Sequence, residues 1–250
     1  MKTRPPRPVH LTILTRPRPI STHTAAFTMA ELILVIIMLA VFLPFCVHHF
    51  ARAHQHSGPT CINDLKLIGT TYRIWANDHR DLYPWAAPCV EGGWRELLAS
   101  SNCGPLCWTN YATMANELGQ SANALVCQQD ERKPTSGLDH LTNNLALSYF
   151  VGVNADQFHP QTILAGDRNI GPGAIPLDNY GYSPDDGQGN DVILKGPVCW
   201  SLKIHSANEG VDIGNILLAD GSVQHVTSSD LRHKWLPDAA TSGPIRLIFP

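Results

Sequence analysis

The amino-acid sequence predicts an α+β fold in which one long helix packs on a mostly antiparallel β-sheet. Apolar residues recur at three- and four-residue steps from Ile62 to Trp75, which is the period of an amphipathic helix. Later runs rich in β-branched and aromatic residues alternate with Gly, Pro, Asn and Asp, as in strands joined by turns. Asp220-Gly221 lies between two such runs and predicts a hairpin with a two-residue turn.

The expected elements follow one another along the chain. Ser57-Gly58-Pro59 precedes the long helix and predicts a kink there. Shorter helices are expected at residues 94–100 and 108–118, and Gly119 ends the second. Residues 228–232 predict a capped helical turn after the hairpin and nothing more. The expected strands are residues 124–127, 146–153, 161–165, 198–204, 214–219, 222–226 and 245–249.

The N-terminal part of the chain predicts a membrane anchor. Residues 1–26 contain five Lys and Arg residues and no acidic residue. The segment from Phe27 to Val47 is mostly apolar and is uncharged apart from Glu31, and about 20 such residues cross a bilayer as a helix. Because basic flanks stay on the cytoplasmic side, we expect the N-terminus inside and the C-terminal part outside. A nucleic-acid-binding arm is a less economical explanation of the Arg- and Pro-rich start.

Glu31 requires an explanation, because a carboxylate within a membrane helix costs about 2.5–3.5 kcal/mol. It stands at the fifth position after a small-residue junction, Ala26, that is followed by Phe27. This arrangement resembles the signal of type IV pilins and of the pseudopilins of type II secretion, in which a prepilin peptidase cuts before the Phe and methylates its new amine. Two departures are Ala26 in place of the usual Gly, and Met29-Ala30 in place of Leu-Ile.

The resemblance extends into the rest of the chain. CINDLKLIGTTYRIWANDHRDLYPW, LVCQQD, LSYFVGVNADQFHPQTILAGDRN and GNILLADGSVQHVTSSDLR are similar, in this order, to blocks of pseudopilin-like type II secretion proteins. It implies a basic leader at residues 1–26, a transmembrane helix at 27–50 and a periplasmic pilin-like domain at 51–250. It also implies a single-pass protein of the bacterial inner membrane that polymerises, through Glu31, with other pseudopilin subunits and acts with the secretion machinery in protein secretion.

Cysteines are numerous in the expected periplasmic domain. Six of the seven lie there: Cys61, Cys89, Cys103, Cys107, Cys127 and Cys199. An oxidising compartment favours disulfides, and we expect at least two to form, although sequence does not choose among the pairings. A zinc site at Cys103 and Cys107 is the alternative, but no second close pair and no His at ligand spacing accompany them.

An acidic, Gly-containing segment is a candidate calcium site. Asp178, Asp185, Asp186 and Asp191 offer carboxylates there, and hard oxygen ligands suit Ca²⁺. The spacing is not that of an EF-hand, and a solvated loop is the alternative. No other cofactor is expected.

The sequence predicts no enzymatic activity. His205, Asp220 and His225 lie around the expected hairpin and could converge, but Asp220 is explained as a turn residue. The chain lacks GxSxG, HExxH and P-loop motifs. A membrane-tethered binding or adhesive protein, exported by the same pathway, is the main rival to a fibre subunit, and a tethered enzyme is the third class.

Overall fold

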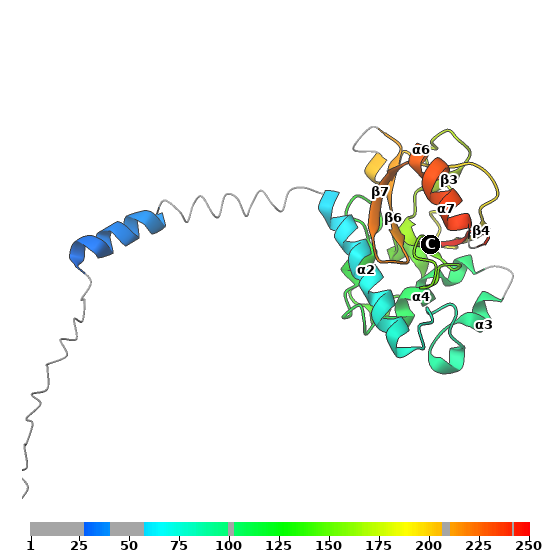
Figure 1. The fold of residues 1–250 in the computed structure, drawn as a ribbon, viewed down its shortest axis with the longest axis horizontal. Helices are drawn as coiled ribbons and strands as arrows, with labels where there is room; N and C mark the ends of the chain where they lie inside the picture. Colours follow the sequence, from blue (N-terminus) through cyan, green and yellow to red (C-terminus); the bar gives the residue numbers. More distant parts are fainter. Residues whose placement is uncertain (1–27, 41–57, 100–102, 207–210, 242) are drawn as a thin grey trace, which may run out of the picture. The chain divides into compact units, whose positions relative to one another are not determined.

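The computed structural model describes residues 28–40, 58–99, 103–206, 211–241 and 243–250 (Figure 1). The chain divides into two units, Met1–Ala53 and His54–Pro250. In the first, residues 29–40 are helical. Within the ranges described, we find no helix that combines the length and the apolar character needed to cross a membrane. The expected leader, residues 1–26, and residues 27 and 41–50 of the expected transmembrane helix lie outside the described residues.

The second unit has the predicted α+β composition. Its helices are α2 (Gly58–Asp78), α3 (Arg95–Leu98), α4 (Cys107–Thr113), α6 (Ser228–Asp230), the π-helix η6 (Leu231–Trp235) and α7 (Leu236–Ala240). Its 3₁₀ helices are η1 (Cys89–Glu91), η2 (Gly104–Leu106), η3 (Ala122–Leu125), η4 (Leu138–His140) and η5 (Asn144–Ala146). Its strands are β1 (Tyr149–Gly152), β2 (Ile163–Asp167), β3 (Ile170–Pro172), β4 (Asn190–Ile193), β5 (Val198–Trp200), β6 (Ile213–Leu218), β7 (Val223–Thr227) and β8 (Arg246–Phe249).

Six strands form one sheet in the order β4-β8-β1-β2-β6-β7, and β3 pairs with β5 in a separate ribbon. Every pairing is antiparallel. β8, the last strand in the chain, inserts between β4 and β1. β4 therefore joins the sheet only through the C-terminal strand β8.

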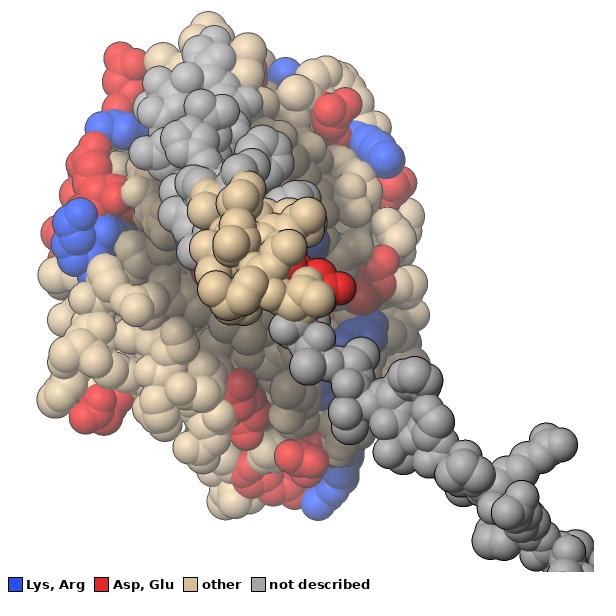
Figure 2. Space-filling model, turned by 90° about the vertical axis from the view of Figure 1, so that its left-hand side faces the viewer, with Lys and Arg blue, Asp and Glu red and all other residues tan. Residues whose placement is uncertain are grey.

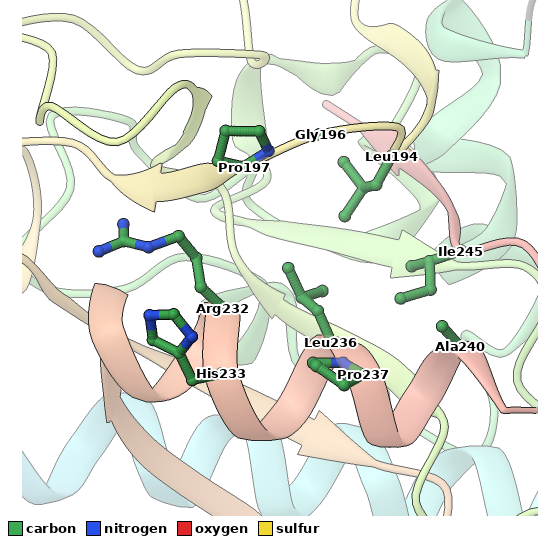
Figure 3. A pocket seen from close by; sticks show the side chains of 9 residues that line it. All are labelled: Leu194, Gly196, Pro197, Arg232, His233, Leu236, Pro237, Ala240 and Ile245. Carbon is green, nitrogen blue, oxygen red and sulfur yellow. The ribbon is translucent and has the colours of Figure 1, made fainter.

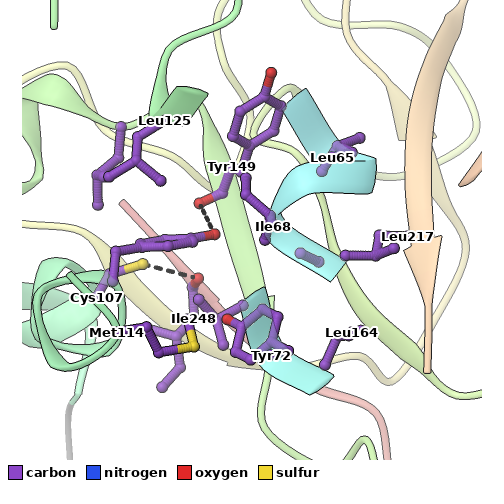
Figure 4. Packing of buried hydrophobic residues seen from close by; sticks show 14 of the residues in the cluster. Leu65, Ile68, Tyr72, Cys107, Met114, Leu125, Tyr149, Leu164, Leu217 and Ile248 are labelled. Atoms are coloured by element: carbon purple, nitrogen blue, oxygen red, sulfur yellow. Dashed lines mark hydrogen bonds between the residues drawn. The ribbon is translucent and has the colours of Figure 1, made fainter. Parts of the chain in front are cut away.

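Side chains alternate between the two faces of the sheet, as the period of a strand requires. Tyr149, Val151, Leu164, Leu217 and Ile248 belong to the core that also contains Leu65, Ile68 and Tyr72 of α2 (Figure 4). Their strand neighbours Phe150, Ile163, Ile216, Leu218, Leu247 and Phe249 belong to a second core with Leu231, Trp235 and Ala239. The sheet thus has α2 on one face and the α6–η6–α7 segment on the other.

The α6–η6–α7 segment differs from the sequence prediction, which was a single capped helical turn after the hairpin. The turn is capped as expected, but the cap is Thr227, one residue before the predicted segment: its Oγ1 accepts a hydrogen bond from the Asp230 amide at 3.1 Å. The helical path then continues to Ala240 because Leu231, Trp235 and Ala239, four residues apart, fall on one face and are buried on the sheet.

The remaining differences concern short elements. Residues 124–127, expected as a strand, lie in η3 and the turn that follows it, while β3 and β4 were not predicted. The β6–β7 hairpin is confirmed, but its loop is longer than two residues. The Leu218 amide donates to Ser222 O, and Gly221 adopts φ +85°, as in a three-residue loop with a left-handed Gly.

We predict that Ile68→Ala lowers the free energy of unfolding by about 2–5 kcal/mol, because Ile68 is fully buried between α2 and the sheet. Leu67→Ala, on the exposed side of the same helix turn, is the control and should change it by less than about 1 kcal/mol. Urea unfolding followed by tryptophan fluorescence measures both. Equal effects of the two substitutions would contradict the packing of α2 described above.

Candidate functional site

Among the residues expected to serve processing and assembly, only Glu31 lies within the described part of the chain. Ala26 and Phe27 are outside it. The Glu31 carboxylate accepts hydrogen bonds from the Thr28 amide at 2.9 Å and from Thr28 Oγ1 at 3.0 Å. In return, Thr28 Oγ1 accepts a hydrogen bond from the Glu31 amide at 3.3 Å. Thr28 and Glu31 therefore form a capping box at the start of the apolar helix.

The capping box gives Glu31 a structural role that the sequence analysis did not identify. Orphan amides at a helix N-terminus need acceptors, and a carboxylate there also interacts favourably with the helix dipole. The apolar side chains that follow it, including Leu32, Ile36 and Leu39, are exposed in the structure. The role of this segment must therefore explain two features: the carboxylate at its start and the exposed apolar side chains that follow it.

One disulfide is present among the described cysteines, and it joins Cys61 near the start of α2 to Cys127 after η3, with their Cα atoms 5.2 Å apart. We expected at least two. Cys107 and Cys199 are buried thiols that donate to different backbone carbonyls, those of Ile248 and Ile175. Cys89 is an exposed free thiol, and Cys103 Sγ donates to the carbonyl of Leu97. These four described cysteines form no further disulfide.

A buried polar cluster lies beside this disulfide. His205 Nε2 is 3.7 Å from Cys127 Sγ, 3.4 Å from Asp167 Oδ2 and 2.8 Å from Asn215 Nδ2. Asn215 donates to Asp167 Oδ2 from both its backbone and its side-chain nitrogen, at 2.7 and 2.9 Å. His225 Nδ1 lies 2.8 Å from Asn215 Oδ1. The cluster therefore extends from β7 through β6 and β2 to the disulfide.

Burial dominates the electrostatics of this cluster. Asp167 is fully buried, which raises its pKa to about 7, although the hydrogen bonds from Asn215 act in the opposite direction. One carboxylate oxygen, Oδ1, has no hydrogen-bond partner in the structure. An unsatisfied buried oxygen of this kind is rare and requires an explanation.

The geometry is not that of a nucleophilic relay. In a Cys-His-Asp relay the nucleophile and the orienting carboxylate lie at opposite nitrogens of the imidazole. Here Cys127 Sγ and Asp167 Oδ2 both lie beside Nε2 of His205, and Cys127 is bonded to Cys61. What the cluster offers chemically is sulfur, imidazole and carboxylate ligands at short mutual distances.

Of the three residues around the expected hairpin, His205 and His225 lie close together and Asp220 does not join them. The rings of His205 and His225 are 6.0 Å apart and perpendicular. Asp220 stays in the β6–β7 loop, where its Oδ1 accepts a hydrogen bond from the Ser222 amide, as its turn role predicts. The sequence analysis missed Asp167 and Asn215, whose signal was the presence of polar residues inside otherwise apolar buried strands.

A second buried polar group is a salt bridge between Asp130 and Arg168. Arg168 donates to both carboxylate oxygens at 2.7 and 2.9 Å, and its guanidinium carbon lies 3.3 Å from the centre of the Tyr180 ring. Burial alone would raise the pKa of Asp130, but the hydrogen bonds and charge of Arg168 outweigh it and hold that pKa below its ordinary value. Nearby, Arg132 donates to the carbonyls of Asn144, Leu147, Pro184 and Pro250. The two arginines tie four loops to the end of the sheet.

The four aspartates of the candidate calcium site do not gather at one point. Asp178, Asp185 and Asp186 are exposed, and Asp186 accepts a hydrogen bond from the Gln188 amide. Asp191 pairs with Arg246 at 2.5 Å and accepts from the Cys103 amide. Among the described residues, the one group of three or more His, Cys, Asp or Glu side chains within ligand distance of each other is Cys61, Cys127 and His205.

The surface of the second unit carries one apolar groove of about 430 Å³. Leu236, Pro237 and Ala240 of α7 face Leu194, Pro197 and Ile245 across it, and Arg232 and His233 lie at one end (Figure 3). On the face drawn in Figure 2, acidic and basic side chains are interspersed around the margin and leave no large patch of one sign.

Comparisons with protein-family models, with curated proteins and with solved structures found no match.

We predict that Cys61 and Cys127 stay unmodified when the unreduced protein is denatured and alkylated, whereas Cys89, Cys107 and Cys199 are modified. Peptide mass spectrometry locates the labels. Replacing both bonded cysteines by Ala should cost about 2–5 kcal/mol of unfolding free energy, because the bond restricts the unfolded chain. Cys89→Ala, at an exposed site, is the control. Labelling of Cys61 in the unreduced sample would refute the pairing.

Asp130→Asn should destabilise the protein by about 3–5 kcal/mol at about pH 7, because it removes the buried counterion of Arg168 and leaves this arginine with the exposed Asp185 carboxylate, 3.8 Å away. A lowered carboxyl pKa stabilises the fold above the unfolded value of about 3.9, and this contribution is lost as pH falls through the folded pKa. The difference between wild type and variant should therefore shrink on acidification, as measured by urea unfolding. Glu131→Gln, which removes a more exposed pair with Lys203, should cost no more than about 1 kcal/mol.

Proposed function

We propose that this chain is a pseudopilin-like structural subunit of a type II secretion or type IV pilus-like fibre and acts in protein secretion. On this proposal a prepilin peptidase cuts between Ala26 and Phe27, and the Phe27 amine becomes methylated. The observation that carries the proposal is the single carboxylate, Glu31, at the start of an otherwise apolar and exposed helical segment. Neither lipid nor local capping alone accounts for both features.

The reason for the carboxylate on this proposal is pairing between subunits. The amine of a newly processed Phe27 on one subunit is attracted to Glu31 of its neighbour. In a low-dielectric environment that attraction offsets the burial of both charges and sets the axial register. The apolar side chains from Leu32 onward are then covered by lipid before assembly and by neighbouring helices after it.

The fold of the second unit agrees with this proposal. An amphipathic helix, α2, lies on an antiparallel sheet, and the late hairpin β6–β7 contributes to the core under that helix through Leu217. The unit would be periplasmic, with the N-terminus of the chain in the cytoplasm and a single pass through the inner membrane. Its partners would be the prepilin peptidase, other pseudopilin subunits and the secretion machinery. No catalytic step is proposed.

The apolar groove of about 430 Å³ beside α7 favours a second candidate, a membrane-tethered binding or adhesive protein exported by the same pathway. Concave apolar surfaces with a few polar groups are the usual form of ligand sites. This candidate needs the anchor but no polymer, so an assembly experiment separates it from the first.

We predict that Glu31→Gln abolishes the ladder of cross-linked oligomers formed through the N-terminal helix, while membrane insertion and removal of the leader continue. Gln preserves the capping box, because its side-chain oxygen still accepts from the Thr28 amide, but it removes the charge that the assembly pairing needs. Cysteine cross-linking in membranes, with immunoblotting of leader removal, measures both outcomes.

Thr28→Ala is the matched control, since it disrupts the capping box and keeps the carboxylate. It should retain the ladder. If Glu31→Gln cross-links like wild type, Glu31 is only a helix cap, and the tethered binding protein becomes the better account.

A further inference from the structure

The Cys61–Cys127 disulfide and His205 form a set of metal-ligand atoms that the proposed function does not use. The two sulfurs and a nitrogen of His205 lie within 4.8 Å of one another, and all three residues are buried. They come from parts of the chain far apart in sequence: α2, the segment after η3 and the segment after β5. Thiolate and imidazole are the ligands that Zn²⁺ prefers in protein sites.

Asp167 supplies a second, independent observation at the same place. Its carboxylate is fully buried, and Oδ2 lies 3.4 Å from His205 Nε2. The other oxygen, Oδ1, has no hydrogen-bond partner in the structure. This carboxylate lies beside the imidazole of the three-residue set and is the neighbouring group that can supply the fourth ligand of a tetrahedral site.

A polar pocket of about 410 Å³ lies next to the cluster. Cys127 is one of its lining residues, together with Asp64, Asn123, Gln128, Asp130, Arg132 and Lys133. Because Cys127 is fully buried, reduction of the disulfide requires the segment that carries it to open toward this pocket.

We propose that reduction of the Cys61–Cys127 disulfide converts this cluster into a zinc site with Cys61 Sγ, Cys127 Sγ and His205 Nε2 as ligands and the Asp167 carboxylate as the fourth. A trialkylphosphine reduces the bond: phosphorus takes oxygen from water and becomes the phosphine oxide, and the two hydrogens of water end on the two sulfurs. Zinc then displaces both thiol protons. The disulfide and the metal are alternative cross-links between α2 and the segment after η3.

The rearrangement that this requires involves the two sulfurs, the imidazole and the Asp167 carboxylate, which must move toward the sulfurs. Zn–S bonds of about 2.3 Å place the two sulfurs about 3.8 Å apart, so they must separate only modestly from their bonded distance. His205 Nε2 exchanges its contact with Asn215 Nδ2 for the metal. Asn215 Nδ2 keeps Asp167 Oδ2 as an acceptor, so its position on β6 is preserved.

The test uses the full chain in detergent, with Co²⁺ and Zn²⁺ as probes, before and after phosphine reduction. The oxidised protein should bind neither metal tightly. The reduced protein should bind one Co²⁺ per chain with a sulfur-to-cobalt charge-transfer band and intense tetrahedral d–d bands, which Zn²⁺ bleaches. These spectra come from wild type, so they do not depend on the folding of any variant.

Variants then assign the ligands. Cys127→Ser and His205→Ala should remove or strongly weaken the cobalt spectrum, and Asp167→Asn should weaken affinity by about 10–100-fold or more. Cys89→Ser and His233→Ala, which change exposed residues elsewhere, should bind as wild type does. A reduced wild type that binds no more metal than the oxidised protein overturns the proposal, and so does an unchanged spectrum for Cys127→Ser. Neither result bears on fibre assembly.

Discussion

The packing of α2 on the sheet is the interaction on which the other features of the second unit depend. Leu65, Ile68 and Tyr72 are fully buried on the face formed by β1, β2, β6 and β8, and burying an apolar side chain of this size contributes about 1.5–3 kcal/mol. Asn110 of α4 donates a hydrogen bond to the Tyr72 hydroxyl, which joins α4 to the same core. The disulfide at Cys61 fastens the first turns of α2 to the segment after η3. Because α2 is held along its length, its start is a fixed point from which an N-terminal extension can leave the domain.

Two polar arrangements are buried where the loops meet this core. The Asp130–Arg168 pair and the Asp167–Asn215–His205 cluster both begin at the end of β2, since Asp167 and Arg168 are adjacent. Buried charges are costly unless they are paired, and a mispaired alternative would leave Arg168 without its counterion. We infer that these groups help to select one arrangement of the loops around the sheet. Apolar packing alone specifies that arrangement less strictly.

The assembly proposal and the zinc proposal address different parts of the chain. The first depends on the charge of Glu31, and the capping box shows that a carboxylate there has a local benefit as well. The second depends on the oxidation state of Cys61 and Cys127, which follows the compartment in which the domain resides. An oxidising compartment keeps the disulfide, and a reducing one exposes the ligand set. The cross-link between α2 and the rest of the domain is preserved in either state, by sulfur or by metal.

The sequence by itself determined the features that depend on local spacing. The stripe from Ile62 to Trp75 predicted α2, Asp220-Gly221 predicted the β6–β7 hairpin, and residues 228–232 predicted a capped helical turn where α6 begins. These predictions succeeded because helix period, turn chemistry and capping act between residues a few positions apart.

Only the tertiary structure decided which distant residues meet. The pairing of Cys61 with Cys127 follows from the packing of α2 against η3. Asp167 and Asn215 meet because β2 pairs with β6. The same is true of the helix ending at Ala240, because its burial exists only once the second face of the sheet has formed. Side-chain type and local spacing carry no record of which strands become neighbours, and a shift of one residue in register would turn Asp167 to the opposite face.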